Sequence, residues 1–211
     1  MNYLTVALSK GRLAEESMKV FARAGVTCQE MAEPSRKLIF LNEELKMKFF
    51  LAKASDVPTY VEYGAADLGV AGKDTLLEEN RRVNEVADFG FGRCQVVVAG
   101  PPEKAALLES AVTLRVATKY PHIARDYFQG QRRRTVEIIK LNGSVELAPV
   151  VGLADVIVDI VETGSTLREN GLVILEEICQ ISARLVANRV SMKLESERIH
   201  QLVHAVKEAL V

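Results

Sequence analysis

The chain contains 211 residues, of which 48% are hydrophobic and 26% charged, and its 27 basic and 28 acidic side chains leave a formal net charge of -1. This balance excludes a strongly basic nucleic-acid-binding surface, and the apolar content excludes an intrinsically disordered chain. Cys28, Cys94 and Cys179 are widely spaced and form no Cys-x-x-Cys pair, so we expect neither a disulfide framework nor a zinc ribbon. The sequence shows no secretory signal and no apolar run long enough to span a membrane, so we expect a cytoplasmic protein.

Short apolar segments alternate with segments of helical periodicity, a pattern typical of α/β proteins. We predict strands over residues 3–8, 37–41, 45–51, 67–71, 94–99, 113–118, 134–141, 155–161 and 182–187. We predict helices over residues 13–24, 56–62 and 103–110, after residue 120, and from residue 194 onward. Apolar residues from Ile199 to Val206 recur at helical spacing, which predicts that the last helix is amphipathic. Continuous apolar runs such as 156–158 indicate strands covered on both faces, as in parallel or mixed sheets.

The pattern begins again after the glycine-containing segment 89–93, which indicates two α/β lobes. We predict one domain formed by residues 1–93 and 181–211 and a second formed by residues 94–180, with a cleft between them. In this arrangement the predicted strand 182–187 returns the chain to the first lobe.

The most informative segment joins a buried strand to a short helix through the turn Thr163-Gly164-Ser165-Thr166. Small residues in such a turn allow backbone N–H groups to converge on an anion, together with the hydroxyl groups and the N-terminus of the helix. Asp159 lies among apolar neighbours, and burying its carboxylate is costly unless a ligand bonds its oxygens. A sugar diol or a metal-bound ligand would do so. The alternative is an ordinary strand, turn and helix with Asp159 facing solvent.

Cations stand beside two other predicted strands. Lys10 and Arg12 lie in the turn after the first strand, and Arg36 follows Ser35 just before the second. Each cation is a candidate phosphate contact because phosphate groups carry negative charge. The alternative is an ordinary solvated surface cation.

Three further patterns have simpler interpretations. Residues 69–74 contain glycines and a lysine, but they lack the spacing of a P-loop and have Asp74 where Ser or Thr is required, which excludes a Walker A site. His200 and His204 are four residues apart on the last predicted helix, but no third metal ligand stands near them, so we expect a solvated helix face. The basic run 132–134 is typical of a solvated turn, with a phosphate or subunit contact as the alternative.

Together these motifs resemble the short form of the ATP phosphoribosyltransferase family, over essentially the whole chain. The resemblance is carried by residues 7–13, 35–40, 54–61, 67–74 and 117–120. It is most specific in the pattern that runs from Glu146 through Asp159 to Leu167.

The resemblance implies an α/β fold with two lobes of the type II periplasmic-binding-protein kind, with mixed β-sheets and the active site in the cleft. It implies transfer of the phosphoribosyl group of 5-phosphoribosyl 1-pyrophosphate (PRPP) to N1 of the adenine of ATP, with release of pyrophosphate. This reaction is the first step of histidine biosynthesis. The implied cofactor is Mg²⁺, held mainly by substrate phosphates rather than by dedicated protein ligands.

Family positions imply roles for particular residues. The implied contacts to the PRPP 5′-phosphate are Thr163, Gly164, Ser165 and Thr166, and those to the ribose hydroxyls are Asp159 and Glu146. The cations expected to stabilise the leaving pyrophosphate are Arg12, Arg36 and Lys10. The candidates on the ATP side are Asp74, Cys94 and Tyr120.

The resemblance also implies partners. Long-form relatives continue into a histidine-binding domain, whereas this sequence ends at Val211, so a homodimer assembled with a regulatory subunit resembling the core of histidyl-tRNA synthetase is expected. No nucleic-acid or membrane partner is expected.

Two alternatives remain for the function. A non-catalytic two-lobe ligand-binding module would have the same architecture. A phosphoribosyltransferase for another base usually carries two adjacent acids before the phosphate loop, whereas here Asp159 and Glu162 are separated by Ile160 and Val161.

Overall fold

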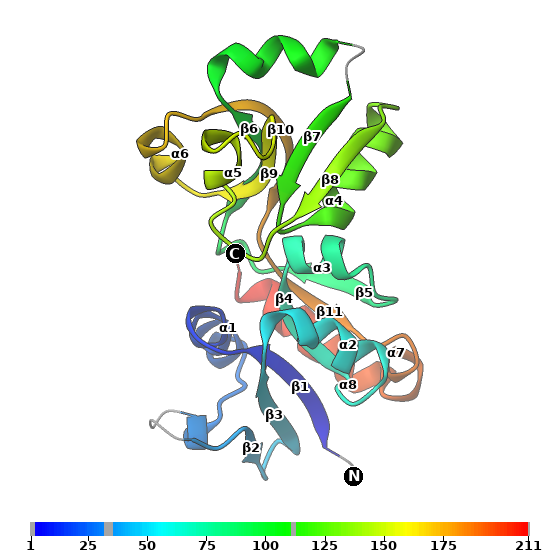
Figure 1. The fold of residues 1–211 in the computed structure, drawn as a ribbon. Helices are drawn as coiled ribbons and strands as arrows, with labels where there is room; N and C mark the ends of the chain where they lie inside the picture. The colour runs from blue at the N-terminus through cyan, green and yellow to red at the C-terminus, as the bar shows by residue number, and fades with distance from the viewer. Residues whose placement is uncertain (1–2, 32–35, 111–112, 211) are drawn as a thin grey trace. The chain divides into compact units, whose positions relative to one another are not determined.

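The structure is a computed structural model that describes residues 3–31, 36–110 and 113–210, so Ser35 of the motif 35–40 lies outside the described residues. The chain forms two compact units, one from the residues up to Gly92 and from Ser182 onward, the other from Arg93 to Ile181. Each unit has its own mixed β-sheet (Figure 1). Each also has its own hydrophobic core. Within the described ranges, no helix combines the length and the apolar character needed to cross a membrane.

The first unit is built on a six-stranded sheet with the order β2-β3-β1-β4-β11-β5. Its strands are β1 (Leu4–Ser9), β2 (Ile39–Asn42), β3 (Met47–Ala52), β4 (Leu68–Gly72), β5 (Asn84–Asp88) and β11 (Ala183–Ala187). Its α-helices are α1 (Arg12–Arg23), α2 (Val57–Glu62), α3 (Lys73–Glu79), α7 (Ser191–Leu194) and α8 (Ser196–Glu208), with 3₁₀ turns at Gln29–Met31 and Ala54–Asp56. Strand β1 is parallel to β3 and β4, whereas β2 and β11 run antiparallel to their neighbours.

Both faces of this sheet are covered, and the alternation of side chains along β1 shows it. Val6 and Leu8 join the core that contains Phe21 of α1 and Ile199 of α8, whereas Ala7 enters a second core beside α2. Successive side chains of a strand point to opposite faces, so an uninterrupted apolar strand requires a helix layer on each side. The predicted amphipathic C-terminal helix is confirmed, since its apolar residues are buried.

The second unit is built on a five-stranded sheet with the order β10-β6-β9-β7-β8. Its strands are β6 (Cys94–Gly100), β7 (Leu114–Thr118), β8 (Val136–Lys140), β9 (Val156–Val161) and β10 (Val173–Ile181). Its helical segments are η3 (Pro102–Glu109), α4 (Pro121–Arg125), the π-helical η4 (Asp126–Gln131), α5 (Leu147–Val150) and α6 (Ser165–Glu169). Strands β7, β8 and β9 are mutually parallel, whereas β6 and β10 are antiparallel additions.

The core on one face of this second sheet lies under α5 and α6, which Figure 1 shows beside β9. Ile157 and Val161 of β9 pack there with Ala148 of α5 and Leu167 of α6. Because side chains alternate along β9, Asp159 belongs to this same face, between two buried apolar residues.

Three of the differences between the structure and the sequence-based expectation have a clear physical reason. Strand β10 lacks the alternation of a regular strand because its register against β6 shifts twice, between Ile174 and Glu176 and between Glu177 and Cys179. Strand β5 is a short edge strand without a buried residue, so it gives no apolar signal. The helix expected over 103–110 is a 3₁₀ helix with no buried residue, and an α-helix of that length needs a packed apolar face for its stability.

Asp155 joins the amino ends of β7 and β9 in the second unit. Its carboxylate accepts hydrogen bonds from the Arg115 backbone N–H at 3.1 Å, from the Arg115 guanidinium at 3.3 Å and from Lys104 Nζ at 3.2 Å. Burial alone would raise the pKa of Asp155, but the bonds from Arg115 and Lys104 outweigh it and lower the pKa below its usual value.

We predict that Asp155→Asn lowers the free energy of unfolding by about 2 kcal/mol near neutral pH, because it removes charge-assisted hydrogen bonds to a side chain that is only 13% exposed. A depressed carboxyl pKa contributes stability above the unfolded-state pKa of about 3.9, and the contribution is lost as the pH falls through the folded-state pKa. Urea unfolding at several pH values measures the difference, with the exposed Asp126→Asn as control. A difference that persists unchanged in acid would contradict this account.

Candidate active site

The second unit has a change of strand order where α/β proteins bind ligands. The chain passes from β7 through α4 to β8 on one side, and its next parallel strand, β9, lies on the other side of β7. Ligands of open α/β sheets bind beyond the carboxyl ends of the strands at such a switch point. Thr118 ends β7 and Val161 ends β9, so the site is expected just beyond these two residues.

A cavity of about 240 Å³ lies at this edge of the sheet. It is lined by Glu146, Asp159, Ile160, Val161, Glu162, Thr163, Gly164, Ser165, Thr166 and Leu167. The structure therefore brings together every residue that the sequence assigned to PRPP, although Glu146 and Thr166 are twenty positions apart in the chain.

Asp159 is half-buried on the wall of this cavity. Burial raises the pKa of Asp159, and the negative charge of Glu146 raises it further, while the Ile160 backbone N–H and the positive charge of Lys119 act in the opposite direction. Two acidic side chains thus line one small cavity, at a free-energy cost to the unliganded fold. Such a cost is typical of a ligand-binding position rather than of a structural one.

The loop between β9 and α6 is shaped by its own side chains. Gly164 has φ +72°, and a side chain there would approach Nη1 of Arg168 to 3.2 Å. The same guanidinium donates a hydrogen bond to the Thr163 carbonyl at 3.1 Å, and the hydroxyls of Thr163 and Ser165 lie 3.2 Å apart. Leu167, which follows the loop, is buried in the core and so attaches the loop to the second unit. The loop consequently presents exposed hydroxyls and backbone groups at the cavity.

The first unit has a corresponding switch point at β1. Strands β3 and β4 lie on opposite sides of β1, so the order changes between β1 and β4. Lys10 and Arg12 follow β1 around Gly11, which has φ +86°, and Asp74 stands in the first turn of α3 directly after β4. Lys10 and Arg12 are exposed, and among the described residues neither has a carboxylate within ion-pairing distance.

Arg36 is placed at the same edge of the first sheet by the strand register. The Leu51 N–H donates to the Leu38 carbonyl, and the Lys10 N–H donates to the carbonyl of Ala52, the last residue of β3. Arg36 is exposed and precedes β2 by three residues. Since β2 runs antiparallel to β3, Arg36 lies near the carboxyl ends of β3 and β1. All three candidate cations therefore stand at one edge of one sheet.

Tyr120 and Cys94 stand at the switch-point edge of the second sheet. Tyr120 follows β7, and Cys94 opens β6, which is antiparallel to β9 and therefore begins where β9 ends. Both side chains are half-buried. Asp74, the third candidate for ATP, belongs to the first unit.

A sequence model described as "HisG: ATP phosphoribosyltransferase" matches residues 53–208. The chain belongs to the ATP phosphoribosyltransferase family. A protein of Lachnoclostridium phytofermentans with that name is 62% identical over 211 residues, covering 100% of this chain and 98% of the relative. A relative of the same name from Lachnospira eligens is 61% identical over 209 residues, covering 99% of this chain and 97% of the relative.

Solved structures confirm the two-lobed α/β fold class. A chain of the "ATP phosphoribosyl transferase (HisG:HisZ) complex from Thermotoga maritima" matches with a TM-score of 0.83 and 35% identity, covering 98% of both chains. The VFT2 domain of BvgS from Bordetella pertussis matches with a TM-score of 0.59 and 13% identity, covering 99% of this chain and 86% of that one, and at this identity only the fold is shared.

Two polar residues next to the site have no role in the sequence-based prediction. Arg168 holds the Thr163 carbonyl, and Thr118 is a fully buried hydroxyl at the end of β7. The available signal for Thr118 was its position, a polar residue that ends an apolar strand just before Tyr120. For Arg168 the sequence offers no comparable signal, because an arginine in a short helix is ordinary.

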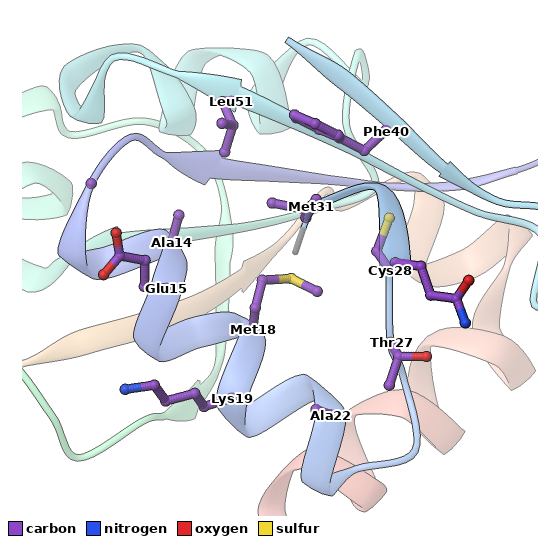
Figure 2. A pocket seen from close by; sticks show the side chains of 12 residues that line it. Ala14, Glu15, Met18, Lys19, Ala22, Thr27, Cys28, Met31, Phe40 and Leu51 are labelled. Carbon is purple, nitrogen blue, oxygen red and sulfur yellow. The ribbon is translucent and has the colours of Figure 1, made fainter. Parts of the chain in front are cut away.

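A larger cavity of about 590 Å³ in the first unit has a different character (Figure 2). Apolar side chains such as Met18, Met31, Phe40 and Leu51 line it, with Glu15 and Lys19 of α1 also on its wall. Burial raises the pKa of the Cys28 thiol. A wall of this composition offers few partners to a phosphate, so the smaller polar cavity is the better candidate active site.

We predict that Asp159→Asn raises the melting temperature near neutral pH, because the neutral amide avoids the cost of an ionised carboxyl beside Glu146. A carboxyl pKa raised by folding penalises the folded state once the pH exceeds the unfolded-state pKa, so the gain is absent in acid. Thermal unfolding at several pH values measures it, with Asp126→Asn as the exposed control. A variant that is less stable than the native protein at neutral pH would show that Asp159 is a structural residue.

Proposed function

We propose that this chain condenses ATP with PRPP to form N1-(5-phosphoribosyl)-ATP and pyrophosphate, the first step of L-histidine biosynthesis. The observation that carries this proposal is the polar cavity that unites Asp159 and Glu146 with the hydroxyl-rich loop 163–166 in a member of the ATP phosphoribosyltransferase family. A ribose 5-phosphate has two chemical ends, a diol and a phosphate, and this cavity offers a matching group for each.

PRPP is proposed to bind to the second unit. Backbone N–H groups and hydroxyls of Thr163, Gly164, Ser165 and Thr166 bind the 5′-phosphate, with the shape of the loop set by Gly164 and Arg168. The carboxylates of Asp159 and Glu146 accept hydrogen bonds from the ribose hydroxyls. For Asp159 these bonds offset the burial that raises its pKa in the unliganded protein.

The reaction needs no nucleophile from the protein, because N1 of adenine attacks C1 of the ribose directly. The C1–O bond to pyrophosphate breaks as the new N–C bond forms, so negative charge grows on the leaving pyrophosphate. Fixed cations directed at that charge lower the barrier. Lys10, Arg12 and Arg36 are proposed for this role because they are exposed and gathered at one edge of the first sheet.

The ATP contacts are proposed from position. Tyr120 and Cys94 are half-buried at the ligand-binding edge of the second sheet, and Asp74 begins the helix after β4 at the switch point of the first. Tyr120 offers an aromatic ring, the group on which a nucleobase stacks.

Enzymes of this family need a divalent metal ion, and we propose Mg²⁺. Within the described residues no group of three or more His, Cys, Asp or Glu side chains is arranged to hold a metal. The oxygen donors of the cavity nevertheless suit Mg²⁺, which is commonly bound by one or two carboxylates together with substrate phosphates. Asp159 and Glu146 are the carboxylates that would contribute, and the bound ion would neutralise charge on the pyrophosphate.

We propose that the chain forms a homodimer and assembles with a HisZ-like regulatory subunit, a relative of histidyl-tRNA synthetase, in the cytoplasm. The Thermotoga maritima structure that matches this chain is a complex of HisG with HisZ, which supports the hetero-oligomer. No nucleic acid or membrane takes part in the proposed reaction.

The direct test of this function is product formation. Incubation of the purified chain with ATP, PRPP and MgCl₂ is expected to yield N1-(5-phosphoribosyl)-ATP, detected by mass spectrometry, with and without its HisZ-like partner. The doubly substituted Arg12→Ala/Asp159→Asn variant, purified in parallel, serves as the control for contaminating activity. If the native chain forms no product under either condition, or no more than the control, the proposed function is wrong.

We predict that Arg36→Ala slows the chemical step about a hundredfold, because a cation facing the leaving pyrophosphate stabilises charge mainly in the transition state. Single-turnover kinetics under rapid quench measure that step. Arg23→Ala, which removes an exposed arginine from the last turn of α1, is the matched control and is expected to react at the native rate. An unchanged single-turnover rate for Arg36→Ala would refute its role at the leaving group.

A further inference from the structure

The pairing between strands β7 and β9 ends at the candidate active site. Their parallel pairing ends with Thr118 opposite Val158, whereas β9 continues to pair with β6 through Asp159, Ile160 and Val161. Among the described residues, no strand pairs with the β7 side of β9 beyond this point. Backbone groups at such a place need other hydrogen-bond partners if they are buried.

The Thr118 hydroxyl occupies this place. It donates a hydrogen bond to the Val158 carbonyl at 2.7 Å and accepts one from the Tyr120 backbone N–H at 2.8 Å. Thr118 and Val158 are both fully buried. On its other side, the Thr118 carbonyl accepts a hydrogen bond from the Leu141 N–H, so Thr118 is tied to the chain that follows β8 as well.

We propose that Thr118 is a positioning residue for the phosphoribosyl transfer, acting through the backbone at Val158 and Tyr120. Its hydroxyl fixes the Val158 carbonyl, and the next residue is Asp159, the proposed ligand of the ribose hydroxyls. The same hydroxyl fixes the backbone of Tyr120, a proposed contact of ATP. This inference rests on the proposed function, because it concerns the residues that bind the two substrates.

Valine has nearly the shape of threonine but cannot form either hydrogen bond. In Thr118→Val the buried Val158 carbonyl and the part-buried Tyr120 N–H lose this partner, and we expect both groups to move to find another. Binding groups must be held to within a fraction of an ångström for full effect. We therefore expect a loss of substrate affinity, because the displaced main chain moves the side chains that bind the substrates.

The first experiment compares Thr118→Val with Thr118→Ser, which keeps the hydroxyl. We expect the dissociation constant for PRPP, measured by calorimetry, to rise about tenfold in Thr118→Val and to stay within about twofold of native in Thr118→Ser. Ser191→Ala is the matched control, because it removes a part-buried hydrogen bond of 2.6 Å from the Ser191 hydroxyl to the Asp67 carboxylate. Asp67 directly precedes β4, so this bond lies away from the carboxyl ends of the strands. It is expected to lower the melting temperature while leaving PRPP affinity and kcat unchanged.

The second experiment tests whether Thr118 acts through Asp159. In a double-mutant cycle, Thr118→Val is expected to raise the PRPP dissociation constant by less than about twofold when Asp159→Asn is already present. Equal effects in both backgrounds, native affinity in Thr118→Val, or the same loss in Thr118→Ser would each overturn the proposal. If Thr118→Val does not fold, Thr118→Ala is measured instead, and failure of both to fold would show that the hydroxyl serves stability alone.

These outcomes are distinct from failure of the proposed function. If the native chain binds PRPP and forms product while Thr118→Val behaves like it, only the positioning role is refuted. If the native chain neither binds PRPP nor forms product, the proposed function fails first and the positioning role fails with it.

Discussion

The carboxylate of Asp159 is the constraint on which the candidate active site of the second unit depends. It occupies a position in β9 where the alternation of side chains calls for an apolar residue, since Ile157 and Val161 on the same face are buried beneath α5 and α6. A carboxylate is tolerated at this position because a polar cavity lies beside it at the edge of the sheet. The loop 163–166 and Glu146, which directly precedes α5, line that cavity, and the hydroxyl of Thr118 bonds the carbonyl of Val158 next to Asp159.

The two units share a design and differ in what they offer to a ligand. Each sheet has a switch point, where the strand order reverses. It lies between β1 and β4 in the first unit and between β7 and β9 in the second. The first presents exposed cations, Lys10 and Arg12, after its strand, and the second presents a carboxylate, hydroxyls and backbone groups. A chain with a net charge of -1 can serve highly anionic substrates if a few cations act locally, as we propose for Lys10 and Arg12, instead of forming a basic surface.

Most of the fold could be predicted because its strands carry continuous apolar runs, and the strongest case is β9, where the buried residues and the acidic exception stand out together. Strand β10 could not be predicted, because two register shifts break the alternation that identifies a strand. The candidate PRPP residues were predictable from the turn after β9 and from family resemblance. The role of Thr118 was not predictable, because its position at the end of an apolar strand does not reveal hydrogen bonds to backbone groups forty and two residues away.

The most direct test of the account is the affinity of Asp159→Asn for PRPP, measured by calorimetry alongside the native chain. If the carboxylate is there to bind the ribose hydroxyls, the dissociation constant rises at least about tenfold in a protein that remains fully folded. Native affinity in the variant would contradict the central claim, because the half-buried carboxylate would then have no partner in the ligand.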